Sequence, residues 1–209
     1  MQQQLFAVPA IEPVLALIAT ALVVMGSPGP STISVTALGS AFGLRRSLPY
    51  LAGVIIGTSV VLVAVAAGLA SVVLSQPRLA PLLLGLSALY ILYLAFAIAT
   101  APPLAETPAQ ALAPGFTGGL LLALANPKAY VAIGAVFAGT QLGLRPELIE
   151  TSVKTAILLA LIVVIHLAWF GAGTAFAGLL RRPLLSRIVN LAFAAALVVT
   201  TLSSLRTLW

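Results

Sequence analysis

The 209-residue chain has no cysteine, no aspartate and few charged residues of either sign. The missing cysteine excludes disulfides, thiolate metal ligands, thiol nucleophiles and dithiol redox chemistry. Charged residues make up 7% of the chain, whereas an ordinary soluble domain carries about 25% to cover its surface. The surface of this protein must therefore face something other than water.

The few charges are mostly basic, ten lysines and arginines against four glutamates, for a net charge of +6. The basic residues form no continuous helix face or stripe, so the sequence predicts no nucleic-acid partner. They lie between apolar stretches, as the anchors of membrane helices do at the water interface. Residues 1–4 carry no positive charge, so we expect the first apolar stretch to be a retained span rather than a cleaved leader. An integral protein of the lipid bilayer is predicted.

Six apolar stretches are long enough to cross a bilayer, which takes about 20 residues per helix. They run roughly over residues 11–42, 48–74, 79–99, 114–140, 153–177 and 185–205. The predicted fold class is all-α: a polytopic membrane protein with six transmembrane helices in a single domain, of which helices 1 and 4 are broken at prolines.

The two broken stretches occupy matching positions in the chain. Residues 28–30 (Pro-Gly-Pro) interrupt the first stretch, and residues 126–128 (Asn-Pro-Lys) interrupt the fourth. The tripeptide Gly-Leu-Arg follows each break, at 43–45 and at 143–145, so the offsets are about 99 and 100 residues. This agreement of break, tripeptide and order indicates an internal repeat, with chance similarity between apolar segments as the alternative.

A linker rich in proline and alanine, residues 101–113, divides repeat 1 (about 10–100) from repeat 2 (about 114–206). Three spans per half is an odd number, so the second half is predicted to cross the membrane inverted, a plan that recurs in secondary transporters. Five lysines and arginines lie on the side of the membrane that holds the loops after the first and fifth spans, and four lie on the other side. The positive-inside rule then slightly favours both termini outside.

The first break predicts a cavity. Pro28, Gly29 and Pro30 interrupt the helix, and backbone groups freed in hydrocarbon are tolerated only where protein or a water-filled cavity satisfies them. Ser31 opens the next half-helix, where its hydroxyl can cap the helix or face a ligand. A plain proline kink without a ligand is the alternative.

The second break adds a charge. Lys128 follows Asn126 and Pro127 in an otherwise uncharged stretch, and a lysine near the bilayer centre costs roughly 2.5–3.5 kcal/mol on insertion scales. It also starts a half-helix, whose positive dipole end opposes a cation. The combination of a helix N-terminus with an ammonium group would hold a carboxylate. Lys128 reaching along the helix to the membrane interface is the alternative.

The side chains present disfavour an enzyme. All four glutamates lie at the edges of spans or in loops, so we expect no carboxylate pair, metal site or cofactor within the membrane. Ser31 and His166 are of the types that hydrolases use, but nothing around either residue activates a serine. His166 lies within the fifth span and is a candidate proton relay, with a hydrogen-bonded structural histidine as the alternative.

Several motifs occur in a fixed order along the chain. They are Pro28-Gly29-Pro30, Ala41-Phe42-Gly43-Leu44-Arg45-Arg46, the pair Gly53 and Gly57, Ala88-Leu89-Tyr90-Ile91-Leu92-Tyr93-Leu94, Gly115-Phe116, and Asn126-Pro127-Lys128. From about residue 10 to 206, their order and spacing resemble the lysine/homoserine exporter family (LysE/RhtB type). The resemblance implies a multi-pass secondary exporter of amino acids or related small metabolites in the bacterial inner membrane, driven by the proton motive force.

The chain departs from the family pattern at two positions. Thr58 follows Gly57 where the family commonly has an acidic residue, and Ser31 stands where it often has asparagine or aspartate. Both changes remove polar or anionic groups from the expected cavity, so a cationic substrate is harder to accommodate. Thr58 and Tyr93 are further candidates for the cavity wall, with an anchor at the membrane interface as the alternative for Tyr93.

The sequence therefore predicts an exporter that works by alternating access on a small neutral or carboxylate-bearing metabolite such as an amino acid. The site is expected where the two broken helices meet, near the midplane. The predicted substrate-binding residues are Pro28, Gly29, Pro30, Ser31, Thr58, Tyr93, Asn126, Pro127 and Lys128. The alternative is a non-transporting membrane scaffold or accessory subunit of the same fold, and a homo-oligomer is an open alternative to a monomer.

Overall fold

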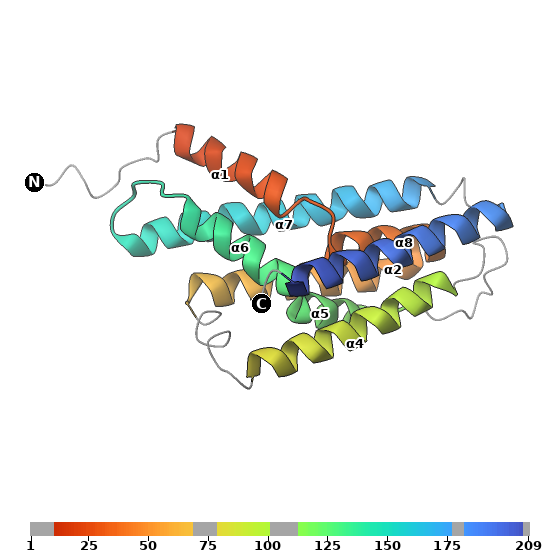
Figure 1. Ribbon diagram of the computed structural model, residues 1–209. Helices are drawn as coiled ribbons and strands as arrows, with labels where there is room; N and C mark the ends of the chain where they lie inside the picture. Colours follow the sequence, from red (N-terminus) through yellow and green to blue (C-terminus); the bar gives the residue numbers. More distant parts are fainter. Residues whose placement is uncertain (1–10, 69–78, 101–112, 177–181, 207–209) are drawn as a thin grey trace, which may run out of the picture.

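A computed structural model describes residues 11–68, 79–100, 113–176 and 182–206, and these ranges are entirely helical apart from their turns (Figure 1). The helices in the described ranges are α1 (Ile11–Val24), α2 (Pro30–Ala66), α4 (Leu79–Ala99), α5 (Phe116–Ala125), α6 (Pro127–Gly139), α7 (Glu147–Phe176) and α8 (Pro183–Arg206). The all-α prediction is confirmed for the described residues.

The helices are interrupted at both predicted places. α1 ends at Val24 and α2 begins at Pro30, whereas only Asn126 separates α5 from α6, whose axes differ by 60°. α2 and α6 are the helices that follow the two breaks, and each begins with a proline, at Pro30 and Pro127. A proline is favourable in this first helical position because its missing N–H would have no partner there.

α2 folds back on itself at Gly43, which has φ 76° and ψ 174°. The hydroxyl of Ser47 donates to the carbonyl of Leu38 at 2.8 Å, although residues nine apart in a straight helix lie about 13 Å apart. Glycine adopts this left-handed conformation without a steric penalty. α2 therefore has two arms, residues 30–42 and 44–66, and the first arm continues the interrupted first span.

Length and composition identify the helices able to cross a membrane. Pro30–Ala66 and Glu147–Ala175 are long and apolar enough, and the bent pair of α5 and α6 makes up to a third span among the described residues. Ile11–Val24 and Pro183–Val199 are shorter apolar helices. The second arm of α2 alone is about 34 Å long at 1.5 Å per residue, enough to cross the hydrocarbon core.

Two helices begin before the corresponding predicted spans. The second arm of α2 begins at residue 44, against about 48 for the predicted span, because Gly43 alone makes the turn. α7 begins at Glu147, against about 153 for the predicted span, since acidic side chains in the first turn stabilise a helix N-terminus. The end of the predicted second span and residues 101–112 of the predicted linker lie outside the described residues.

Glycines bring the second arm of α2 against α5. A Cβ atom on Gly53 would lie 2.0 Å from the carbonyl oxygen of Phe116, and one on Gly119 would lie 2.1 Å from that of Tyr50. A Cβ on Gly57 would lie 2.7 Å from the Cβ of Ala123. These close contacts show that the pair Gly53 and Gly57 serves helix packing, and they place the end of α5 beside α2.

α2 lies at the centre of the bundle, with its most extensive contacts to α5 and α7. α4 and α8 pack side by side, and α1 lies along α6 and α7 (Figure 1). Most of the buried hydrophobic side chains belong to two clusters, one around α2, α4 and α5 and the other around α1, α6 and α7.

The two Gly-Leu-Arg turns lie at opposite ends of α7. The first arm of α2 packs against the C-terminal part of α7, where a Cβ on Gly39 would lie 3.1 Å from the ring of Phe170. The loop that contains Gly143 contacts Glu150, near the N-terminal end of α7. Gly143 has φ 72°, close to the 76° of Gly43, so the same tripeptide makes a left-handed turn at both places.

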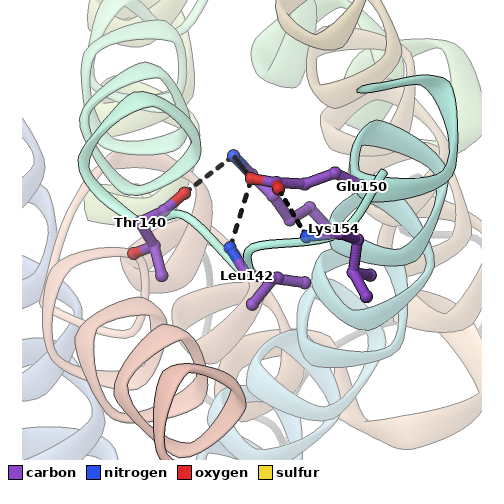
Figure 2. Close-up of polar contacts among 5 residues, drawn as sticks. Thr140, Leu142, Glu150 and Lys154 are labelled. Carbon is purple, nitrogen blue, oxygen red and sulfur yellow. Dashed lines mark hydrogen bonds and ion pairs between the residues drawn. The ribbon is translucent and has the colours of Figure 1, made fainter. Parts of the chain in front are cut away.

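Glu150 and Lys154 hold this second turn (Figure 2). The carboxylate of Glu150 accepts from the backbone N–H groups of Leu142 at 3.2 Å and Leu144 at 3.1 Å. The ammonium of Lys154 donates to the carbonyl of Thr140 at 2.8 Å and lies 3.7 Å from Glu150 Oε1. Both leucines are buried in the cluster around α1 and α7, so the pair fixes the loop against the core.

Candidate functional site

Asn126 joins the two breaks. Its side-chain Oδ1 accepts from the backbone N–H of Lys128 at 3.1 Å and so caps α6. Its Nδ2 donates to the hydroxyl of Ser31 at 2.9 Å, in the first turn of α2. Both side chains are buried. The side-chain amide of Asn126 therefore links the N-terminal ends of α2 and α6.

Lys128 makes a second link between the breaks. Its Nζ donates to the carbonyl and hydroxyl of Ser27, at 2.7 and 2.8 Å, and to the carbonyl of Pro28 at 2.8 Å. An ammonium group has three N–H donors, and these three acceptors use all of them. Lys128 thus points across to the first break rather than along its helix to the membrane interface.

Gly29 leaves the space through which Lys128 passes. A Cβ atom on Gly29 would lie 2.6 Å from Lys128 Cδ and 2.9 Å from its Nζ. The backbone of Gly29 is extended, at φ −168°, so steric room rather than conformational freedom requires the glycine. Its N–H donates to the hydroxyl of Thr32 at 2.9 Å, which satisfies a backbone group freed by the break.

Helix ends of both signs meet at the junction. The first arm of α2 begins at Pro30 and α6 begins at Pro127, and these N-termini meet through Asn126. Each N-terminus carries a partial positive charge from its helix dipole, and Lys128 adds a full one. α1 and α5 end beside the same junction, at Val24 and Ala125, and their C-termini carry partial negative charge. Among the described residues, no acidic side chain lines the cavity. Lys128 and the two N-termini suit an anionic group such as a carboxylate.

A cavity of about 40 Å³ lies at the junction and extends to α7. Thr58 and His166 line it, each 5% exposed, and neither Thr58 Oγ1 nor His166 Nε2 has a hydrogen-bond partner in the described structure. His166 Nδ1 lies 2.7 Å from the carbonyl oxygen of Ile162. A carbonyl only accepts, so Nδ1 carries the proton and Nε2 of the neutral ring is an acceptor.

A larger groove of about 440 Å³ opens between α1 and α6. It shares Ser27, Lys128 and Ala132 with the smaller cavity, so the two spaces adjoin at the lysine. Its remaining wall is apolar, formed by Val23, Val24, Pro127, Val131 and Ala135.

The structure brings most of the predicted site residues together. Gly29, Ser31, Thr58, Asn126, Lys128 and His166 line the small cavity, Pro127 lines the groove, and Pro28 supplies a carbonyl to Lys128. Tyr93 is elsewhere: its side chain is 59% exposed on α4, on a face shared with Leu92 and Phe96, and it lines neither space. The structure thus places Tyr93 outside these two spaces, in keeping with the alternative of an anchor at the membrane interface, and the sequence does not reveal which face of an apolar helix is buried.

Two contact residues were absent from the predicted site. Ser27 supplies two of the three acceptors of Lys128, and its place directly before Pro28 was the available signal. Trp169 donates from its indole N–H to the carbonyl of Gly26 at 3.0 Å, which ties the first break to α7. No pattern in the sequence connects Trp169 with residues so distant along the chain.

Interrupted helices whose broken ends meet at a polar junction inside an apolar bundle are typical of membrane transport proteins. The family model described as LysE type translocator matches residues 22–206, and the chain belongs to this family. It is therefore a membrane protein and a transporter rather than an enzyme, and the resemblance seen in the sequence is confirmed.

Two curated relatives are the cysteine/O-acetylserine efflux proteins of Salmonella choleraesuis (strain SC-B67) and Salmonella typhimurium (strain LT2). Each is 31% identical to the chain over 173 residues, which cover 82% of this chain and 87% of the relative. No solved structure gives a significant match.

Proposed function

We propose that the chain exports amino acids or closely related small metabolites across the bacterial inner membrane as a secondary transporter. The names of the efflux relatives support the direction and the substrate class. The single observation that carries the proposal is the contact of Lys128 Nζ with the first break at 2.7–2.8 Å. It places the positive charge of α6 beside two helix N-termini, where a substrate carboxylate would bind.

The proposed mechanism is alternating access, with one half of the protein rocking against the other. Lys128 and Asn126 both hold α6 to the first break. A carboxylate that binds Lys128 competes with the carbonyls of Ser27 and Pro28 for its N–H groups and so weakens this link. The substrate would thereby favour a rearrangement of the two halves, with the proton motive force as the driving gradient and His166 as the candidate proton relay.

The proposed topology is six spans in two inverted three-helix repeats. The matching breaks, the left-handed turns at Gly43 and Gly143, and the position of these turns at opposite ends of α7 support it. Each half would contribute one interrupted helix to the site. A multi-pass arrangement with both termini on one side follows from the even number of spans.

Efflux from proteoliposomes tests the function. Lys128→Met keeps an unbranched side chain one atom shorter but removes the charge, so the efflux rate of a loaded amino acid should fall by about tenfold or more, as expected for the loss of a charged hydrogen bond of about 1.5–3 kcal/mol. Arg187→Met is the matched control, because it removes one exposed positive charge from α8 away from the site.

The comparison includes empty liposomes and a panel of amino acids. Equal leak rates for wild type, Lys128→Met and empty vesicles across the whole panel would contradict export and favour the alternative, a non-transporting scaffold of the same fold. A loss of efflux in Arg187→Met as large as in Lys128→Met would remove the specific role of Lys128.

A further inference from the structure

We infer that the substrate is a free α-amino acid with an aliphatic side chain, bound with its carboxylate at Lys128, its ammonium in the 40 Å³ cavity and its side chain in the groove between α1 and α6. This inference rests on the proposed function and adds the substrate class. It follows from the chemistry and size of two adjoining spaces that share Ser27 and Lys128.

The smaller space holds only a small group, and an ammonium is small enough to fit. A cavity needs about 10–15 Å³ to hold one water molecule, so 40 Å³ admits a group of a few non-hydrogen atoms and excludes a whole amino acid. An ammonium group is close to water in size. Lys128 stands at the mouth of this cavity, where both spaces meet, so a carboxylate bound there leaves the neighbouring amino group within reach of the cavity.

The cavity also offers acceptors that lack donors. Thr58 Oγ1 and His166 Nε2 are buried without a hydrogen-bond partner in the described structure. Buried polar groups are almost always paired, so these two atoms point to a ligand or water that completes them. Because His166 Nδ1 donates to Ile162, Nε2 accepts, and an N–H donor such as an ammonium satisfies it.

The groove selects the side chain. Valines and alanines of α1 and α6 form most of its wall, and its polar groups lie at the end shared with the small cavity. A hydroxyl or amide on the substrate side chain would lose its water there without gaining a partner. An aliphatic side chain has no hydrogen bond to lose there. Each methylene that it adds favours the longer substrate over the shorter one by about tenfold or more.

A second groove, of about 520 Å³ between α4 and α8, provides the contrast. In the part of the chain that the structure describes, its wall consists of leucine, alanine, valine and phenylalanine side chains. None of these side chains binds a carboxylate, so we assign the groove no substrate. It supplies a matched position, Ala195, for testing the groove at Lys128.

Counterflow in proteoliposomes loaded with leucine tests the substrate class. Unlabelled leucine should compete with labelled leucine better than alanine or serine does, and 2-hydroxy-4-methylpentanoate, which lacks the ammonium, should compete about tenfold less well. Thr58→Val removes one acceptor at nearly constant volume. The Thr58→Val variant should be inhibited less strongly by unlabelled leucine than the wild type is. Inhibition by the hydroxy acid should be the same in both proteins.

The groove is tested by filling it. Ala135→Leu should lower leucine counterflow by about tenfold and alanine counterflow by less than about twofold, since only the longer side chain reaches the added methyl groups. Ala195→Leu fills the other groove and should leave both unchanged.

Equal competition by leucine and serine, or an equal loss for leucine and alanine in Ala135→Leu, would overturn the assignment and indicate that lipid fills the groove. Counterflow by the hydroxy acid as strong as that by leucine would overturn the ammonium site. Failure of the proposed function itself would appear differently, as no transport of any amino acid above empty vesicles.

Discussion

At the scale of single residues, Lys128 is stabilised by acceptors that the first break releases. The carbonyls of Ser27 and Pro28 are freed where helical hydrogen bonding stops, and Lys128 uses both. The break and the lysine therefore provide hydrogen-bond partners for each other, because the carbonyls of one and the ammonium of the other would both be unpaired in an apolar bundle. A proline kink without a partner does not account for this pairing.

Gly29 allows that contact, and its substitution is the sharpest residue-scale test. Gly29→Ala places a Cβ within 2.6–2.9 Å of the Lys128 side chain, so Lys128 must move away from Ser27 and Pro28. We expect amino-acid efflux to fall by about tenfold, the effect of losing one charged hydrogen bond. Proteoliposome efflux measures this.

Gly134→Ala is the control for Gly29→Ala, because a Cβ on Gly134 of α6 meets open space. It should transport as wild type does. If Gly29→Ala also transports at the wild-type rate, the contact of Lys128 with the first break is not required for function.

At the scale of elements, short contacts determine how the helices and turns are held. Glycines permit the second arm of α2 to touch α5, and Gly43 permits α2 to reverse. Glu150 and Lys154 fix the loop between α6 and α7 through its backbone (Figure 2). The position of the second break therefore depends on packing at both ends of the α5–α6 pair.

Glu150→Gln tests the loop contact. Glutamine offers one acceptor oxygen in place of two and carries no charge to pair with Lys154, so one of the two N–H groups, on Leu142 or Leu144, loses its partner. We expect a loss of stability of about 1–3 kcal/mol, seen as a lower melting temperature in detergent and faster hydrogen exchange in the peptide that contains both leucines.

Glu147→Gln serves as the comparison, because Glu147 is exposed in the same helical turn. It should leave exchange at the two leucines unchanged. The same exchange rates in Glu150→Gln and in wild type would show that the loop is held by its buried leucines alone.

At the scale of the whole molecule, the two Gly-Leu-Arg turns lie at opposite ends of α7, as the proposed inverted repeat requires. The absence of cysteine makes this directly testable, since any introduced thiol is unique. Arg45→Cys and Arg145→Cys mark the same position of the two Gly-Leu-Arg tripeptides, and both arginines are exposed. A membrane-impermeant thiol reagent should label one in intact spheroplasts and the other only in inside-out vesicles.

The wild-type protein is the control for this labelling and should not react. Labelling of both variants from the same side would contradict the inverted repeat. It would also contradict a site built from one interrupted helix of each half.

The sequence by itself determined the features that local chemistry governs. Too few charges to cover a soluble surface predicted a membrane protein, and prolines at 28, 30 and 127 predicted where helices break. A proline cannot donate the hydrogen bond that continues a helix, whatever the tertiary structure. The predicted apolar stretch 79–99 also coincides with a helix of the structure, α4.

Only the tertiary structure decided which residues meet. It directed Lys128 to Ser27 rather than to the interface, and it exposed Tyr93 instead of placing it in the cavity. It also grouped Thr58 with His166 around one small space. In a chain that is apolar on every helix face, periodicity does not distinguish core from lipid, so the inward face of each helix is set by packing against its neighbours, here through the glycines of α2 and α5.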